Sequence, residues 1–250
     1  MLILLSNDDG VWAPGIAAAR AALESVGEGW TVAPDREQSA SSHSLTLQRP
    51  LRIHPIAERV FSVDGTPTDC VLVAVNHILG RRPDLVVSGE NAGQNMGEDV
   101  IYSGTVAAAM EGTVLGIPAM AVSKMITDRQ HSDYTAAARV AADLARRFAD
   151  WPLPAGSLLN VNVPDLPFDD IKGVKVTRTG TRVYRDVVVE KIDPRGRPYY
   201  WVGGAPEFSG GEDTDWFAVD AGYVSATPLQ LDMTDHRSLD TVRQWASRKP

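Results

Sequence analysis

Short apolar runs alternate with stretches of helical hydrophobic spacing along the first two thirds of the chain. The apolar runs predict buried strands over Met1–Ser6, Trp30–Ala33, Pro83–Ser88, Ile117–Ser123 and Leu158–Val163. The stretches between them predict helices over Gly15–Val26, Cys70–Leu79, Val106–Val114 and Tyr134–Ala149. Such alternation is typical of βαβ units, in which helices cover both faces of a parallel sheet. We therefore expect a three-layer, Rossmann-like α/β fold with a mainly parallel sheet.

The pattern changes after Pro164. Val183–Ile192 and Tyr199–Val202 read as two strands joined by a turn at Asp193–Gly196, and Ser238–Ser247 predicts a closing helix. A two-stranded arm is marginally stable alone and needs a surface to pack against. We expect an α/β core of residues 1–164 and a C-terminal extension of residues 165–250 that packs on it and carries a β-hairpin arm for oligomerisation.

Composition narrows the class of protein. The 250 residues include 24 Lys and Arg against 32 Asp and Glu, a formal net charge of −8. This acidic balance argues against duplex nucleic acid or an anionic membrane as partner. No apolar run is long enough to span a bilayer, and the first apolar run has no basic flank typical of a signal peptide. The single cysteine excludes an intrachain disulfide and a cysteine-cluster zinc site. We expect a cytoplasmic protein.

Two adjacent carboxylates, Asp8 and Asp9, follow the first predicted strand. Residues 1–19 contain no Lys or Arg to neutralise them. Like charges this close raise one pKa or recruit a cation, and Mg²⁺ or Mn²⁺ prefers carboxylate, amide and hydroxyl oxygens. Ligands of α/β sheets bind at the carboxyl ends of strands, where neighbouring loops offer such oxygens on Ser39, Ser41, Asn91 and Asn95. The other interpretation is an Asn-Asp-Asp-Gly turn without metal.

A long, glycine-rich connection over Asn91–Thr105 follows the third strand. Ser103-Gly104-Thr105 leads directly into the helix predicted from Val106. Backbone N–H groups at a helix start bind phosphate, although the same residues also serve as a simple helix cap. The spacing matches neither a Walker loop nor the dinucleotide Gly-x-Gly-x-x-Gly fingerprint.

Other reactive side chains are weaker candidates. His43 lies in the loop after the second strand and is the one histidine placed to assist catalysis. Cys70 follows a good helix start at Thr66–Asp69, yet its apolar neighbours favour simple burial. The chain has no Gly-x-Ser-x-Gly motif of a serine hydrolase.

Several ordered motifs resemble one known family, the SurE-type nucleotidases. The matching segments are Leu4–Gly10, Ala33–Arg36, Ser44–Thr46, Gly65–Cys70, Val86–Gly112, Asn160–Pro164 and Gly222–Ser225. The similarity runs nearly from end to end. It implies a metal-dependent phosphatase that hydrolyses nucleoside 5′- and often 3′-monophosphates, with some members also cleaving short polyphosphate. It also implies dimers or tetramers that exchange their C-terminal segments.

The resemblance also implies roles for particular residues. Carried onto this sequence, the metal ligands are Asp8, Asp9, Ser39 and Asn91, and the metal is a divalent cation such as Mn²⁺ or Mg²⁺. Phosphate contacts fall on Asn95, Ser103, Gly104 and Thr105. A metal-activated water would attack the phosphoryl group, with Asp8 or Asp9 accepting its proton.

One position departs from the family pattern: Glu90 stands where the family usually has an apolar residue. If Glu90 follows strand alternation, its side chain points away from that of Asn91. Turned toward the metal, it would add negative charge and alter the metal preference. We expect the orientation away from Asn91 and keep the ligand set unchanged. Two other functions stay open. A non-catalytic regulator would bind nucleotide at the same loops, and an interaction protein would use the aromatic arm as its working surface.

Overall fold

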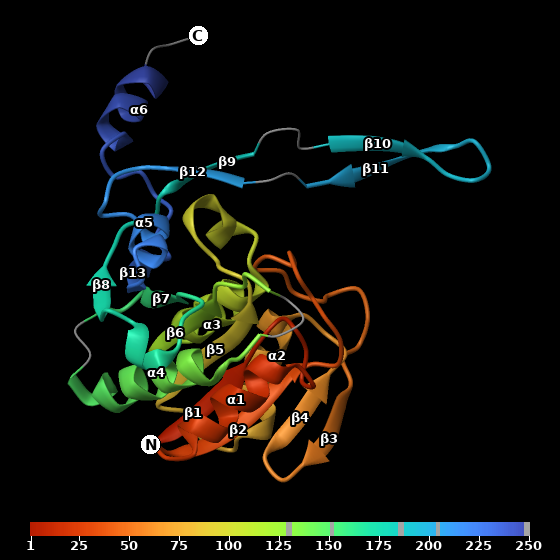
Figure 1. The fold of residues 1–250 in the computed structure, drawn as a ribbon, viewed down its shortest axis with the longest axis vertical. Helices are drawn as coiled ribbons and strands as arrows, with labels where there is room; N and C mark the ends of the chain where they lie inside the picture. Colours follow the sequence, from red (N-terminus) through yellow and green to blue (C-terminus); the bar gives the residue numbers. More distant parts are fainter. Residues whose placement is uncertain (129–131, 151–152, 185–187, 204–205, 248–250) are drawn as a thin grey trace.

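A nine-stranded sheet forms the centre of the molecule, in the order β3-β4-β2-β1-β5-β6-β7-β13-β8 (Figure 1). The computed structural model describes residues 1–250 except 129–131, 151–152, 185–187, 204–205 and 248–250. The strands of the first part are β1 (Leu2–Ser6), β2 (Glu28–Pro34), β3 (Ile53–Ala57), β4 (Val60–Val63), β5 (Leu85–Ala92), β6 (Ala119–Lys124) and β7 (Ser157–Val163). Neighbouring strands run parallel except in the pairs β3–β4 and β7–β13. The expected three-layer, mainly parallel α/β fold is confirmed.

Helices cover both faces of this sheet. Alternate residues of β1 point to opposite sides, so Ile3 and Leu5 pack with α1 (Pro14–Leu23) and α4 (Thr135–Arg146). Leu4 packs with α2 (Pro67–Val73) and α3 (Gly104–Val114) on the other face. A π-helical turn (Ala74–Ile78) extends α2, and 3-10 turns occupy Gly97–Ile101, Arg147–Asp150 and Phe168–Asp170. The two apolar cores therefore lie above and below one shared sheet.

The order of the strands creates a crevice between β1 and β5. From β1 the chain builds the sheet outward through β2 to β4, and from β5 it builds in the opposite direction through β6 to β7. The connections after β1 and β5 therefore diverge to opposite sides, which leaves room at the carboxyl ends of these two neighbours. The residues that follow β1 and those that end β5 meet at this point.

The structure corrects several predicted boundaries. β5 was expected to end at Ser88 but continues to Ala92, because a register shift against β6 between Ser88 and Asn91 lets pairing resume. Helix α3 begins at Gly104 rather than Val106. Strands β3 and β4 were not predicted, since β3 is a mostly exposed edge strand without an apolar run. The predicted helix start at Thr66 is confirmed as a capping box with Asp69.

The C-terminal segment both joins the sheet and leaves it. β13 (Val224–Gln230) and β8 (Val174–Val176) extend the main sheet, next to α5 (Asp215–Asp220). β9 (Thr181–Tyr184) pairs with β12 (Pro206–Ser209), and β10 (Val188–Ile192) pairs with β11 (Pro198–Val202) in the predicted hairpin. The strand predicted over Val183–Ile192 is thus two strands, and residues 185–187 lie outside the described part. The division of the chain after residue 164 stays a prediction.

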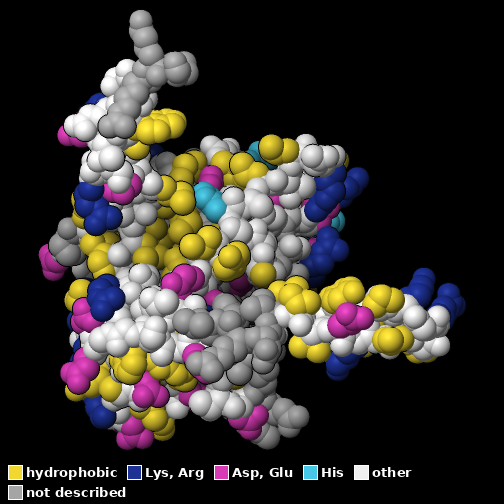
Figure 2. Space-filling model, turned by 90° about the horizontal axis from the view of Figure 1, so that it is seen from above, with side chains coloured by type: hydrophobic (Ala, Val, Ile, Leu, Met, Phe, Trp, Pro, Cys, Tyr) yellow, Lys and Arg dark blue, Asp and Glu magenta, His cyan; other side chains and the backbone are white. Residues whose placement is uncertain are grey.

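These two ladders project from the core as a long arm, and α6 (Leu239–Ala246) stands apart near the C-terminus (Figure 1). Every residue of β10 and β11 is exposed, and α6 has no buried residue. Hydrophobic side chains are therefore exposed to solvent along the arm (Figure 2). Tyr200 is 57% exposed and Trp201 63%.

Close packing of α1 on β5 depends on one glycine. A Cβ atom at Gly15 would lie 2.1 Å from the backbone oxygen of Glu90 and 3.2 Å from the Tyr134 ring. Glu90 precedes Asn91, one of the candidate ligands, so this contact sets the helix against the strand that carries the site.

We expect Gly15→Ala to lower the free energy of unfolding by about 1–3 kcal/mol, because the added methyl group forces α1 away from β5. Alanine is otherwise the better helix former by about 1 kcal/mol, so intrinsic propensity predicts the opposite sign. Urea denaturation followed by circular dichroism measures the change. The matched control is Gly29→Ala in β2, where a Cβ atom meets nothing within 4 Å. A Gly15→Ala variant as stable as the control would contradict the packing argument.

Candidate active site

Asp8 is the second residue after β1 and lies at the crevice between β1 and β5. Asp8 is only 4% exposed to solvent. The Thr105 hydroxyl donates a hydrogen bond to Oδ1 of Asp8, and the Gln38 backbone N–H donates one to the Asp8 carbonyl at 2.7 Å. Burial raises the pKa of Asp8 to about 6; the Thr105 hydrogen bond opposes this rise, and the neighbouring charge of Asp9 adds to it. A cation beside the two carboxylates would offset both the burial of Asp8 and its repulsion from Asp9.

The start of α3 packs directly against Asp8. A Cβ atom at Gly104 would lie 2.8 Å from the Asp8 Cβ and 2.7 Å from the Ser41 hydroxyl oxygen, so only glycine fits there. Ser103 caps the helix, its hydroxyl accepting a 3.0 Å hydrogen bond from the Val106 N–H. The positive end of the helix dipole therefore faces the Asp8 carboxylate, an arrangement that favours negative charge.

Asp9 connects the end of β1 to the end of β5, whereas Asn91 bonds within its own segment. Oδ2 of Asp9 accepts a 2.9 Å hydrogen bond from the backbone N–H of Ala92. The Asn91 amide nitrogen donates to the Gly93 carbonyl at 2.7 Å. That bond uses the nitrogen, whereas the amide oxygen is the atom that a hard cation would bind.

Ser39 lies in the loop after β2 and is exposed. Its hydroxyl donates to Oε1 of Glu37 at 2.8 Å.

A cavity of about 590 Å³ opens beside these groups. The predicted residues Asp8, Ser39, Asn91, Asn95 and Ser103 line it. Asp9 lines a smaller neighbouring cavity of about 240 Å³, which also reaches Ser39. Gly104 and Thr105 are not among the residues that line either cavity; both contact Asp8, Gly104 by close packing and Thr105 through its hydroxyl.

Residues that the sequence did not single out complete the cavity wall. Tyr102, which is 60% exposed, precedes α3, and Val202 and Gly203 come from the hairpin arm. Arg182 of β9 forms an ion pair with Asp99, and both line the cavity. No local pattern marks Arg182 as a site residue, because its place in the cavity results from the return of the C-terminal segment over the 3-10 turn of residues 97–101.

Two other candidates lie outside the cavity. His43 forms a 2.9 Å contact through Nε2 with Glu111 on α3, and it does not line the cavity. Cys70 is fully buried, and burial, with the nearby charge of Asp69, raises the pKa of its thiol well above the ordinary value. The expectation that Cys70 is simply buried is thereby confirmed.

The comparisons with known proteins now identify the family. The family model described as "Survival protein SurE" matches residues 3–186. The chain belongs to the SurE family.

Relatives in this family match over almost the whole length. The 5′-nucleotidase SurE of Geobacter metallireducens is 53% identical over 246 residues, which are 98% of this chain and 97% of that protein. The 5′/3′-nucleotidase SurE of Cronobacter sakazakii is 53% identical over 249 residues, 99% of this chain and 97% of that protein. A crystal structure of the SurE protein from Aquifex aeolicus superposes with a TM-score of 0.88 at 45% identity, covering 98% of this chain and all of the other.

Glu90 stands where the resemblance to the family predicts an apolar residue. It is fully buried and lines neither of the two cavities beside the candidate ligands. Neither carboxyl oxygen has a hydrogen-bond partner within the described residues. Burial raises the pKa of Glu90 well above its ordinary value, and the charge of Lys124 acts in the opposite direction. A buried carboxyl without partners costs folding free energy.

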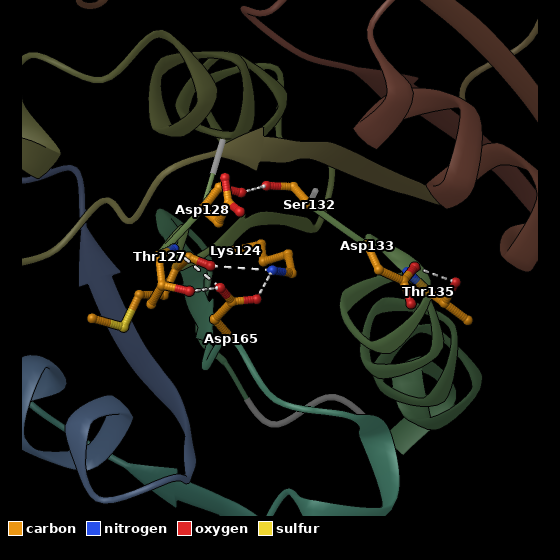
Figure 3. Close-up of polar contacts among 8 residues, drawn as sticks. Lys124, Thr127, Asp128, Ser132, Asp133, Thr135 and Asp165 are labelled. Carbon is orange, nitrogen blue, oxygen red and sulfur yellow. Dashed lines mark hydrogen bonds and ion pairs between the residues drawn. The ribbon is translucent and has the colours of Figure 1, made fainter. Parts of the chain in front are cut away.

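Lys124 is a second buried ionisable residue, at the end of β6 and only 1% exposed. Its ammonium group donates to Oδ1 of Asp165 and, at 3.3 Å, to the Met125 carbonyl (Figure 3). Thr127 donates to the other oxygen of Asp165 through its hydroxyl and its backbone N–H. Partial burial raises the pKa of Asp165, but the hydrogen bonds from Lys124 and Thr127 outweigh it and hold the pKa below its usual value.

We expect same-sized apolar replacements of these two buried groups to have opposite effects. Glu90→Met should raise the free energy of unfolding by about 1 kcal/mol, because it removes two unsatisfied oxygens. Lys124→Met should lower it by about 2 kcal/mol, because Asp165 loses its partner and Glu90 loses the opposing charge. Urea denaturation gives both values.

The control for this pair is Glu58→Met, which replaces a carboxyl whose side chain is 89% exposed. Its free energy of unfolding should change by less than about 0.5 kcal/mol. Destabilisation by Glu90→Met would contradict the description of Glu90 as an unpaired buried group.

No helix in the described part of the chain combines the length and apolar character that crossing a bilayer requires.

Proposed function

We propose that the protein is a divalent-metal-dependent nucleotidase that hydrolyses nucleoside 5′-monophosphates, and 3′-monophosphates as a second substrate class, to nucleoside and phosphate. One observation carries the proposal: Asp8 lies beside the N-terminus of α3 and lines the cavity of about 590 Å³, and the adjacent Asp9 lines the smaller cavity next to it. The site thus combines oxygen donors for a cation with N–H donors for an anion. The names of the relatives, 5′-nucleotidase and 5′/3′-nucleotidase, support the same reaction.

The proposed metal ligands are Asp8, Asp9, Ser39 and Asn91. No group of three His, Cys, Asp or Glu residues suited to a metal occurs among the described residues, so amide and hydroxyl oxygens must complete the set. Carboxylate, amide and hydroxyl oxygens suit Mg²⁺ or Mn²⁺ rather than zinc. A bound divalent cation would supply positive charge for the phosphoryl group and make a water molecule more acidic.

The remaining chemistry is assigned to the residues of the chain. The Ser103 hydroxyl, the Asn95 amide and the first N–H groups of α3, at Gly104 and Thr105, would bind the phosphoryl oxygens and hold them for in-line attack. Thr105 also fixes one carboxylate oxygen of Asp8. One carboxylate of the pair Asp8 and Asp9 would accept the proton of the attacking water.

The size of the cavity favours a nucleotide over inorganic phosphate. Pockets of about 300–1,000 Å³ accommodate small organic ligands. With the phosphate near Asp8 and Ser103, the nucleoside would lie toward Tyr102 and the arm residues Val202 and Gly203.

Assembly into a homodimer or homotetramer is part of the proposal. The exposed faces of β10, β11 and α6 support it, because apolar surface of this kind is usually covered by a partner. The change of sequence pattern after Pro164 supports a core of residues 1–164 with an extension of residues 165–250. The cytoplasmic location stays a prediction.

The test is phosphate release from a panel of nucleoside monophosphates after chelation, with Mn²⁺, Mg²⁺ or no metal restored. We expect release only when a metal is restored, because Asp8 and Asp9 need a cation to act together. Release in the presence of chelator would refute the metal dependence. Nucleotide binding without release under any condition would favour the regulator instead.

We expect Asp9→Asn to abolish phosphate release while the protein stays folded. Asp9 is partly exposed, and an asparagine oxygen can still accept the hydrogen bond from Ala92. The loss of one negative charge should weaken metal binding, which isothermal titration with Mn²⁺ measures. Glu58→Gln, an exposed acid in the turn between β3 and β4, serves as control. Undiminished turnover in Asp9→Asn would remove Asp9 from the ligand set.

A further inference from the structure

Asn95 is held by side chains from two neighbouring strands. Oδ1 of Asn162 accepts a 2.8 Å hydrogen bond from the Asn95 backbone N–H, and Nδ2 of Asn162 donates at 3.1 Å to the Asn95 carbonyl. One amide side chain thus pairs with both backbone groups of a loop residue. Nδ2 of Asn160 donates a second hydrogen bond, at 2.8 Å, to the same carbonyl.

The side chain of Asn95 is also oriented. Its Nδ2 donates at 2.7 Å to the hydroxyl oxygen of Ser123, the β6 residue opposite Asn162 in the sheet. An amide nitrogen carries two N–H groups, so one remains when Ser123 accepts the other. Asn95 lines the large cavity, whereas Ser123, Asn160 and Asn162 do not. Ser123, Asn160 and Asn162 therefore hold Asn95 through hydrogen bonds without lining the cavity themselves.

Strand geometry puts these anchors where an apolar core would otherwise continue. Asn160 and Asn162 are two residues apart in β7, on the face where Leu158 packs against α2 and α3. Ser123, Asn160 and Asn162 are all fully buried. Burying amide groups costs free energy unless they form hydrogen bonds, and the Nδ2 group of each asparagine donates its hydrogen bond to Asn95.

The loop around Asn95 needs such anchoring. Gly93 adopts φ 129°, a conformation open to glycine, and this part of the chain leaves β5 before the 3-10 turn of residues 97–101. A hydrogen-bond donor aimed at phosphate is effective only when its position is fixed before the substrate binds.

We propose that Asn162 is the positioning residue of the phosphate site, and that with Asn160 and Ser123 it holds Asn95 so that one amide N–H meets a phosphoryl oxygen. This inference rests on the proposed nucleotidase function. It assigns to the Asn160–Asn162 strand end a role in the reaction, although neither side chain touches the cavity.

The test compares Asn95→Ala, Asn162→Ala and the double variant in nucleoside monophosphate hydrolysis. Asn162→Ala should lower kcat/KM by about 100-fold, the scale expected for a donor misplaced by about 1 Å. The double variant should be no worse than Asn95→Ala, because Asn162 acts only through Asn95. Losses that multiply in the double variant, or an unchanged kcat/KM in Asn162→Ala, would overturn the proposal.

Two further variants separate positioning from stability. Ser225→Ala on β13 is the matched control, since Ser225 is buried, pairs with Asn162 in register and has no hydrogen-bond partner for its hydroxyl among the described residues. It should keep full activity. If Asn162→Ala does not fold, Ser123→Ala provides the test: it leaves the backbone anchors in place and should lower kcat/KM by about 10-fold, less than a full misplacement of the donor. Full activity of Ser123→Ala would then overturn the proposal.

Inorganic phosphate, titrated by calorimetry, distinguishes failure of this inference from failure of the proposed function. Weaker phosphate binding by Asn162→Ala than by Ser225→Ala supports the positioning role. If the wild-type protein binds phosphate but hydrolyses no nucleotide, the proposed function fails and the phosphate affinities of the variants still decide on Asn162. If the wild-type protein hydrolyses nucleotide without measurable phosphate binding, the proposed function stands and the kcat/KM values of the variants decide on Asn162.

Discussion

The carboxylate of Asp8 lies where water is largely excluded, and the first turn of α3 makes that position tolerable. Thr105 donates to one oxygen, and the helix start packs so closely that position 104 admits only glycine. This contact joins the end of β1 to a helix almost a hundred residues later. β1 and β5 are neighbouring strands on either side of the crevice, so Asp9 also accepts a hydrogen bond from the end of β5. The candidate ligands thus depend on one shared crevice.

Beneath that crevice, the sheet changes character from apolar to polar. On the face toward α2 and α3, Leu158 and Ala121 give way to Asn160, Asn162 and Ser123 near the carboxyl ends of β6 and β7. The apolar part stabilises the layers, whereas the polar part positions a loop. Leu158, Asn160 and Asn162 are alternate residues of β7, so the apolar and the polar part of this face belong to one strand. The stability of the core and the geometry of the loop that carries Asn95 are therefore coupled.

The C-terminal segment has two relations to the core. β13 is hydrogen-bonded to β7 and is as much a part of the main sheet as the earlier strands. The arm, in contrast, contributes Arg182 and Gly203 to the cavity and leaves its aromatic residues exposed. The C-terminal segment thus lines the cavity beside Asp8 and also presents exposed apolar surface.

Much of this arrangement follows from local pattern. The apolar run of β1, the Ala-rich helix α4, the capping box at Thr66 and the hairpin of β10 and β11 all depend on neighbours within a few residues, and each was predictable. So was the place of Asp8 and Asp9 at a strand end. The extension of β5 to Ala92 was not, because pairing with β6 resumes only after a register shift.

Only the tertiary structure decided which distant residues meet. Asn162 reaches Asn95 across 67 positions, and Arg182 reaches Asp99 because the last third of the chain returns over the loop. The burial of Glu90 near Lys124 likewise results from strands that lie side by side in the sheet. Hydrophobic period and turn chemistry are properties of short segments. Strand order and register, which bring these side chains together, are set by the packing of the whole sheet.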